Sequence, residues 1–413
     1  MIDKPLNVLL VVLDGARPDH LACYGYERET APFLDKMARD GVRFARAFGC
    51  GPAAVSSHAA MLTGLFAAAH GATEEHRALR PSVPLLSEHL KRAGYRTAAF
   101  CPHPDIAPET GFGRGFDRFH TQRSGGYIAG TAADYARRAS DRVLGRRDAG
   151  ARRTTEAVCD WLGLDDAPFF AFVHFAEPAH AQPPPAPYDR LFLPRAPAQP
   201  SAHEVASALH AGALRYIDLR LTQIADRLIA NGQWEQTLVI ATAGHAAALT
   251  DDAGDPLSDA RLHVPLLMRG PGLPRGFVVD EFAQPPDLFA TIAAVTGSGE
   301  VPAPLQGRIL LRQGAAVPGR RCVIAETYRN EPGDVRRKAL RTSREKFVWQ
   351  SDEANALFDL NSDPHERRNL FAADTGRADG LRRQLFDWLA TAERWAPPEA
   401  ELGSALEPQR AHT

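Results

Sequence analysis

The stretch N-V-L-L-V-V-L-D-G-A-R-P-D-H, from Asn7 to His20, decides the fold prediction. Its first seven residues, Asn7–Leu13, are a run of Val and Leu typical of a strand buried on both faces of a parallel sheet. Asp14 follows directly, at the strand end where open α/β sheets bind their ligands. A carboxylate there either ligates a hard cation or caps a helix, and the residues alone leave both readings open.

Helical and strand patterns alternate after this first strand. The helices are expected at Ala31–Gly41, Ser57–Leu65, Pro84–Gly94, Thr154–Leu162 and Ala206–Asn231, and the strands at Arg96–Phe100, Phe169–Phe175, Thr237–Thr242 and Val264–Arg269. Strands separated by such helices imply crossover connections, so the fold class is α/β, with helices on both faces of a parallel sheet. The Pro-rich and Ala-rich stretch Glu177–Pro200 is predicted to be a long surface loop.

The pattern changes after Gly297, where strand signals become short and closely spaced. They fall at Cys322–Thr327, Lys338–Arg341, Lys346–Gln350 and Ala356–Leu360, and a final helix is expected at Gly380–Trp395. We therefore predict a core domain over residues 1–300, a small α+β subdomain over 301–396, and a frayed, disordered tail over 397–413.

Composition excludes several classes of partner. The chain has 413 residues, and its 48 basic and 50 acidic side chains nearly balance, which argues against nucleic acid and anionic membrane surfaces as partners. The six-residue apolar run at the start is too short for a membrane span or a signal peptide, so we expect a cytoplasmic protein. The five scattered cysteines form no C-x-x-C pair, which predicts reduced thiols rather than disulfides or a zinc site.

Two further stretches are candidate site segments. Ser56, Ser57 and His58 stand before a helical run, where free backbone N–H groups would bind an anion, or where a serine would simply cap the helix. His245 ends the strand pattern Leu238–Thr242 shortly after small residues, as a ligand or as a hydrogen-bonded structural residue. Each signal is weak when taken alone.

Taken together and in order, these motifs resemble the sulfatase family of the alkaline-phosphatase superfamily. Six blocks carry the resemblance over nearly the whole chain. They are D-G-A-R-P-D-H-L-A-C-Y-G-Y at Asp14–Tyr26, T-A-P-F-L-D-K-M-A-R-D-G-V-R-F at Thr30–Phe44, S-S-H-A-A-M-L-T-G at Ser56–Gly64, F-F-A-F-V-H-F-A-E-P at Phe169–Pro178, H-V-P-L-L-M-R-G-P-G at His263–Gly272 and L-F-D-L-N-S-D-P-H-E-R-R-N-L at Leu357–Leu370. The third block is similar to the P-S-H-A-S-L-L-T-G variant of the family signature. The resemblance implies a large, mixed, mostly parallel sheet sandwiched by helices, with a small C-terminal subdomain.

The resemblance also implies the family's chemistry, in which an oxygen nucleophile at a helix N-terminus attacks a sulfate or phosphate ester polarised by a divalent cation. By this alignment Asp14 and His245 are the metal positions, and Arg17 and His58 match the family's basic positions. The nucleophile position, however, is Ala54, and Gly244 replaces a metal-binding aspartate.

Other expected positions are also altered. Gly15 replaces the second aspartate that some family members use, and Ala179 stands where the D-P-H loop has its histidine, with His180 one place late. We therefore expect no stoichiometric cation, and Ca²⁺, Mn²⁺ or Mg²⁺ only if the site is functional.

Two replacements could restore the missing groups. Cys50 in C-G-P-A-A superficially resembles a formylglycine precursor, four residues before the aligned nucleophile. The loop carboxylates of Asp251, Asp252, Asp255 and Asp259 could replace the missing metal ligand.

Three hypotheses about function follow. The first is a sulfatase-like hydrolase with a non-standard site, using Cys50 or an activated water. The second is a non-catalytic protein. Either its pocket binds a small anionic ester, sulfate or phosphate through Ser56 and Ser57, helped by Arg17 and a protonated His58, or its surface serves an interaction partner. The third uses His58, His103, His174 or His245 as an acid or base for other chemistry. The empty positions favour the second and third over a conventional sulfatase, and the oligomeric state stays open.

Overall fold

The computed structural model describes residues 5–121, 148–163, 167–179, 182–194, 199–250, 254–301, 305–312, 315–328, 336–351 and 354–393. The predicted disordered tail, His180, Asp251 and Asp252 lie outside the described residues.

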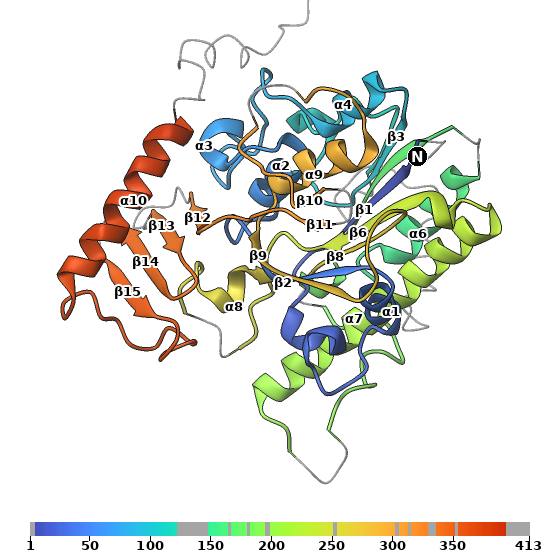
Figure 1. Ribbon diagram of the computed structural model, residues 1–413. Helices are drawn as coiled ribbons and strands as arrows, with labels where there is room; N and C mark the ends of the chain where they lie inside the picture. The colour runs from blue at the N-terminus through green and yellow to red at the C-terminus, as the bar shows by residue number, and fades with distance from the viewer. Residues whose placement is uncertain are drawn as a thin grey trace, which may run out of the picture.

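A mixed, mostly parallel sheet forms the centre of the fold (Figure 1). Within the described part of the chain it has nine strands, in the order β4-β3-β5-β1-β6-β8-β2-β7, with β9 also paired to β2. The strands are β1 Asn7–Leu13, β2 Val42–Phe48, β3 Arg96–Phe100, β4 Arg118–His120, β5 Phe169–Phe175, β6 Thr237–Thr242, β7 His263–Val264, β8 Leu266–Arg269 and β9 Phe277–Ala283. β1 pairs in parallel with β5 and β6, whereas β8 is antiparallel to β6 and β2. The predicted fold class is confirmed.

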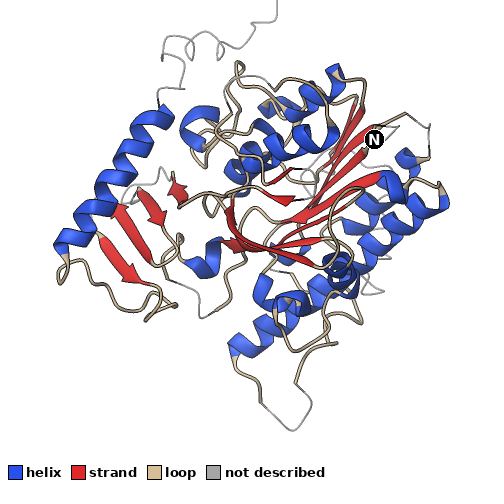
Figure 2. Cartoon of the chain, in the orientation of Figure 1, coloured by secondary structure: helices blue, strands red, loops and turns tan. Residues whose placement is uncertain are grey.

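Complete burial explains the apolar run of β1. All seven residues of this strand are buried, and its Val and Leu side chains pack into the main hydrophobic core. Burying one such side chain contributes about 1.5–3 kcal/mol. The strand can bury both of its faces because helices lie on the two sides of the sheet (Figure 2).

Two groups of helices make these outer layers. α1 Pro32–Arg39, α6 Ala151–Leu162 and α7 Ala202–Ala230 pack together on one side, and α2 Ala54–Thr63, α3 Ala67–His70, α4 Leu86–Arg92 and α9 Asp287–Thr296 gather on the other (Figure 1). Short helical segments are α8 Asp259–Leu262 and the 3-10 turns Pro18–His20, Ala22–Tyr24, Pro108–Thr110, Glu177–Ala179 and Trp234–Gln236.

A small antiparallel sheet follows toward the C-terminus. Its strands are β12 Val323–Thr327, β13 Arg337–Arg341, β14 Glu345–Gln350 and β15 Ala356–Asp359, and α10 Thr375–Glu393 packs against it. Leu381, Leu385 and Leu389 of α10 meet Phe347 of β14 in one hydrophobic cluster. A separate hairpin pairs β10 Leu311–Arg312 with β11 Ala315–Ala316. The domain division at residue 300 stays a prediction.

Several elements differ from the sequence prediction. β2, β4, β9 and α9 were not predicted, and in β2 the charged Arg43 and Arg46 interrupt the apolar pattern. The single strand expected at Val264–Arg269 is two strands divided at Pro265, since proline has no N–H to donate to a ladder. α7 starts at Ala202, earlier than expected, because Ser201 and Glu204 form a capping box there. α10 likewise starts earlier, at Thr375.

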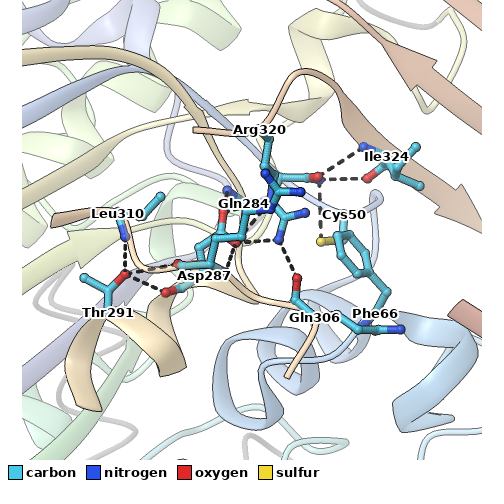
Figure 3. A network of polar contacts seen from close by, with 10 residues as sticks. Cys50, Phe66, Gln284, Asp287, Thr291, Gln306, Leu310, Arg320 and Ile324 are labelled. Carbon is cyan, nitrogen blue, oxygen red and sulfur yellow. Dashed lines mark hydrogen bonds and ion pairs between the residues drawn. The ribbon is translucent and has the colours of Figure 1, made fainter. Parts of the chain in front are cut away.

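A buried polar network joins the C-terminal sheet to the core (Figure 3). The Gln284 side chain donates to the carbonyl of Ile324 at 2.7 Å and accepts from its N–H at 3.1 Å, like an added strand residue. Beside it, Asp287 at the start of α9 is fully buried and accepts from Arg320 Nε at 3.0 Å. Because both charges are buried, each is stabilised mainly by the other, and removing one leaves the other buried without a counter-charge.

We expect Asp287→Ala to lower the free energy of unfolding by about 3–5 kcal/mol, because it leaves the buried Arg320 guanidinium without its counter-charge. The double variant Asp287→Ala/Arg320→Met should lose clearly less than the sum of the two single losses. Denaturant unfolding measures both. Asp40→Ala, which removes the exposed i,i+4 pair with Lys36, is the control and should cost under about 1 kcal/mol. Additive single and double losses would contradict the coupling.

Candidate active site

Asp14 lies immediately after β1, in the turn where that strand leaves the sheet. Its N–H donates to the carbonyl of Phe175 at 2.8 Å, so the turn stays attached to β5. Gly15 has a φ of 79°, and a Cβ there would lie 2.6 Å from Cα of Ala179. Because Gly15 also forms a bridge with Ala246, the segment after β6 is held beside Asp14.

Two histidines face the buried Asp14 carboxylate. His245 Nδ1 is 3.2 Å from Asp14 Oδ1, and His174 Nε2 on β5 is 3.6 Å from Oδ2. Although burial alone raises the pKa of Asp14, the imidazoles of His245 and His174 hold it well below its usual range. Burial likewise works against the protonated form of His174, but the Cys101 thiol and the Asp14 carboxylate raise its pKa to about 10. The carboxylate is thus compensated by imidazole.

Two more histidine rings complete this group, which we name the Asp14 cluster: Asp14, His58, His103, His174 and His245. The ring of His58 on α2 packs edge-on against His174, with centroids 4.7 Å apart, and His103 lies 6.0 Å from His174. Burial lowers the pKa of His58 to about 3, with a further contribution from His174. The expectation of a protonated His58 is therefore wrong. Its Nδ1 lies 2.7 Å from the carbonyl of Ala54, so Nδ1 carries the proton and Nε2 has no hydrogen-bond partner.

The start of α2 differs from the serine cap considered above. The N-cap is Ala53, which makes no side-chain hydrogen bond, and Ala54 is the first helical residue. Ser56 and Ser57 are buried within the first turn, and the Ser57 hydroxyl donates to the carbonyl of Gly244 at 2.8 Å. Ser57 therefore joins α2 to the end of β6 instead of capping the helix.

The other predicted basic residue, Arg17, is occupied by a neighbour. Its guanidinium donates to Asp19 through Nε at 3.0 Å and Nη2 at 2.6 Å, and through Nη1 to the carbonyl of Ala247 at 3.1 Å. The Asp19 carboxylate neutralises the charge of this guanidinium, so Arg17 attracts an anionic ligand less strongly than an unpaired arginine would.

Cys50 also points elsewhere. It is buried in the cluster between the core and the C-terminal sheet, with Gln284 Nε2 3.8 Å from its Sγ (Figure 3). Burial raises the pKa of this thiol well above its usual value, so nothing activates it as a thiolate.

Of the four loop carboxylates, the two that are described face the C-terminal sheet. Asp255 lies 3.6 Å from Arg337, and Asp259 accepts from Arg341 at 3.0 Å and Lys346 at 2.9 Å. Neither is placed to replace Gly244 as a metal ligand, because these pairs already hold their carboxylates.

A divalent cation, implied by the resemblance, would take its ligands from Asp14 and His245. Among the described residues, no group of three or more His, Cys, Asp or Glu side chains has an arrangement that could hold a metal ion. Ca²⁺ and Mg²⁺ prefer several oxygen ligands, and Asp14 brings a single carboxylate to the cluster. The described donor set does not fit the cation, and we derive no chemical step through one.

Sequence reasoning missed Cys101, which is 1% exposed at the end of β3 and acts on the pKa of His174. The available signal was its position. β3 and β5 are parallel neighbours, so the residue after β3 lies at the same sheet edge as His174.

The model of the sulfatase family, described simply as "Sulfatase", matches residues 6–298. The chain belongs to the sulfatase family. Two curated proteins illustrate what the chain is similar to in sequence. The chain is 25% identical to the multifunctional alkaline phosphatase superfamily protein PehA of Trinickia caryophylli, with 96% of each chain covered. Over 142 residues it is 32% identical to mouse steryl-sulfatase, a match spanning 28% of this chain and only 22% of that relative.

Among solved structures, the phosphonate monoester hydrolase of Agrobacterium radiobacter superposes with a TM-score of 0.80 at 22% identity, covering 94% of this chain and 96% of that one. This likeness confirms the alkaline-phosphatase-like fold. No helix in the described ranges is long and apolar enough to cross a membrane.

We expect the two packed imidazoles to differ in charge at pH 7, with His58 neutral and His174 protonated. The raised pKa of His174 stabilises the fold below pH 6.5, and this stabilisation is lost as the pH rises through about 10. The lowered pKa of His58 stabilises the fold above pH 6.5, and this contribution is lost as the pH falls toward about 3. Imidazole NMR against pH checks both, and Asp14→Asn should lower the pKa of His174. A doubly protonated His58 at pH 6 would contradict the assignment.

Proposed function

We propose that this sulfatase-family protein has lost the conventional hydrolysis of its relatives and keeps a degenerate reaction centre. The observation that carries the proposal is Ala54 at the first position of α2, where the aligned nucleophile would stand. A methyl group has no lone pair with which to attack sulfur or phosphorus. Removing a covalent nucleophile typically costs orders of magnitude in rate, although oriented water can retain a part.

The packing around Asp14 supports the same conclusion. Both carboxylate oxygens face imidazoles. A Cβ on Gly15 would meet Ala179, and a Cβ on Gly244 would lie 2.9 Å from Cβ of Ser57. An aspartate at either position would therefore require the neighbouring residues to shift.

As part of this proposal, the protein binds a small anionic ester, sulfate or phosphate at the groups of the site that remain. The first turn of α2 still presents backbone N–H groups and the positive end of the helix dipole. The neutral His58 and the paired Arg17 add less than the sequence suggested, so we expect weak binding. The proposal includes a cytoplasmic location, supported by the five free cysteine thiols.

A second candidate is acid–base or water-based chemistry at the Asp14 cluster. The observation that favours it is that buried ring nitrogens of His58 and His174 lie without hydrogen-bond partners among the described residues. Such nitrogens can exchange a proton with a bound molecule.

We expect the wild-type protein to show negligible turnover of 4-nitrophenyl sulfate and 4-nitrophenyl phosphate with added Mn²⁺ or Ca²⁺, and no change on Cys50→Ala, because that thiol is buried and protonated. The measurement is the steady-state turnover of both esters by the wild-type protein and by Cys50→Ala. Robust turnover abolished by Cys50→Ala would make Cys50 the nucleophile and overturn the proposal. Robust turnover that survives Cys50→Ala but is lost in His174→Asn would establish the water-based alternative.

If Ser57 shifts to admit a side chain at position 244 and the pocket stays otherwise intact, we also expect Ala54→Thr/Gly244→Asp to gain both cation affinity and ester hydrolysis, because it restores a hydroxyl at α2 and a second carboxylate beside Asp14. Isothermal titration with Mn²⁺ measures the affinity separately from turnover. Ala54→Thr/Gly244→Asn is the matched control, since it has nearly the same size without the charge. One equivalent of cation retained by the wild-type protein after dialysis would refute the expected vacancy and point to Asp251 or Asp252 as the missing donor.

A further inference from the structure

A second constellation of polar side chains lies outside the Asp14 cluster. His20 Nδ1 is 2.7 Å from Asp19 Oδ1, and His20 Nε2 is 2.8 Å from the Oγ of Ser207 on α7. The three residues thus form a continuous chain of short hydrogen bonds from carboxylate to imidazole to hydroxyl. We infer that Ser207, His20 and Asp19 are a nucleophilic triad that reacts with carboxylic esters.

The two hydrogen bonds select the tautomer that such chemistry needs. A carboxylate only accepts, so Nδ1 of His20 carries the proton and donates to Asp19. In the neutral ring Nε2 is then the acceptor, and the Ser207 hydroxyl donates to it. A hydroxyl donating to an imidazole whose other nitrogen is held by a carboxylate is the arrangement that activates serine nucleophiles.

The surroundings hold these groups in place. His20 is 5% exposed and stacks on Tyr26 with ring centroids 5.0 Å apart, while His210 packs edge-on at 5.0 Å. Asp19 is 57% exposed, but the two hydrogen bonds from Arg17 fix its carboxylate. Ser207 itself is partly exposed, so a substrate can reach it.

The proposed step balances without any further cofactor. Ser207 Oγ forms a bond to the acyl carbon and passes its proton to His20 Nε2. The ester C–O bond breaks, and the leaving alkoxide takes that proton. Water then attacks the acyl-serine, gives its proton to His20, and releases the acid as the serine is restored. The net reaction is ester plus water to acid plus alcohol, catalysed by residues that take no part in the Asp14 cluster.

The apolar side chains near Ser207 indicate the substrate class. Ala208 and Ala211, one and four residues beyond it, pack against Phe192, and Leu191 beside Phe192 is 50% exposed. Because the Arg28 guanidinium also lies 4.8 Å from the centroid of the Phe192 ring, this surface fits an ester with an apolar acyl chain better than a cationic one.

The molecule contains its own control. Ser298 Oγ lies 2.9 Å from His89 Nε2, so this pair has the same serine–histidine contact, and Ser298 is also partly exposed. Within the described residues, no ion pair or hydrogen bond joins the His89 ring to a carboxylate. Ser298 should therefore be much less reactive than Ser207.

The test is the rate of labelling by an alkyl fluorophosphonate, in which Oγ bonds to phosphorus and fluoride leaves, with sites located by peptide mass spectrometry. We expect Ser207 to be labelled at least about 100-fold faster than Ser298, and its labelling to be lost in Ser207→Ala and His20→Asn. Asp19→Asn should slow it at least about tenfold, and Asp19→Glu should recover part of the rate. Hydrolysis of 4-nitrophenyl butyrate should follow the same order, while Ser298→Ala changes neither.

Equal labelling of Ser207 and Ser298 in the wild-type protein would overturn the inference, and this comparison requires no variant to fold. Labelling of Ser207 that persists in a folded His20→Asn variant, as judged by its melting curve, would overturn it as well. Loss of sulfate or phosphate ester turnover bears only on the Asp14 cluster, so the two proposals fail separately.

Discussion

The burial of the Asp14 carboxylate is the constraint on which the site depends. A lone carboxylate inside a protein costs several kcal/mol unless an opposite charge and hydrogen bonds compensate it. The parallel register of β1 with β5 and β6 provides this compensation, since Val12 is paired with His174 on one side and Thr242 on the other. The same register brings the end of β6, and with it His245, to the strand end where Asp14 leaves the sheet.

Much of the fold could be predicted because a strand buried on both faces of a sheet is a stretch of mostly apolar residues in the sequence. β1, β5 and β6 were predicted to the residue, since each is a predominantly apolar run whose residues are all buried. β2 and β9 are not fully buried in this way. β9 lies at the sheet margin with Phe277 and Val278 exposed, and its polar residues hide the strand period. Edge position explains why β9 was not predicted, whereas β2 is paired on both sides and its apolar pattern is interrupted by Arg43 and Arg46.

The candidate site was only partly predictable, for a different reason. Asp14, Ala54, His58 and His245 came from ordered motifs, and the structure brings Asp14 and His245 to 3.2 Å. Motifs do not state the charge of a residue. The neutral His58 and the occupied Arg17 follow from burial and from Asp19, which are properties of the packed chain. The contact between His20 and Ser207 spans 187 positions and needed the structure.

The histidines around Asp14 also explain how a buried carboxylate could remain in the proposed degenerate site. The carboxylates of a metal site repel one another unless a cation lies between them. A site with fewer carboxylates therefore has a lower cation affinity, but also less electrostatic repulsion when no cation is bound. A buried carboxylate needs a compensating positive charge, and the pKa of the neighbouring His174, raised by Cys101 and by Asp14, favours a protonated imidazole beside it. A cation held by Asp14 and His245 would lie close to the protonated ring of His174, and the two positive charges would repel each other. The proposed loss of cation binding therefore implies that proton and metal compete for one carboxylate.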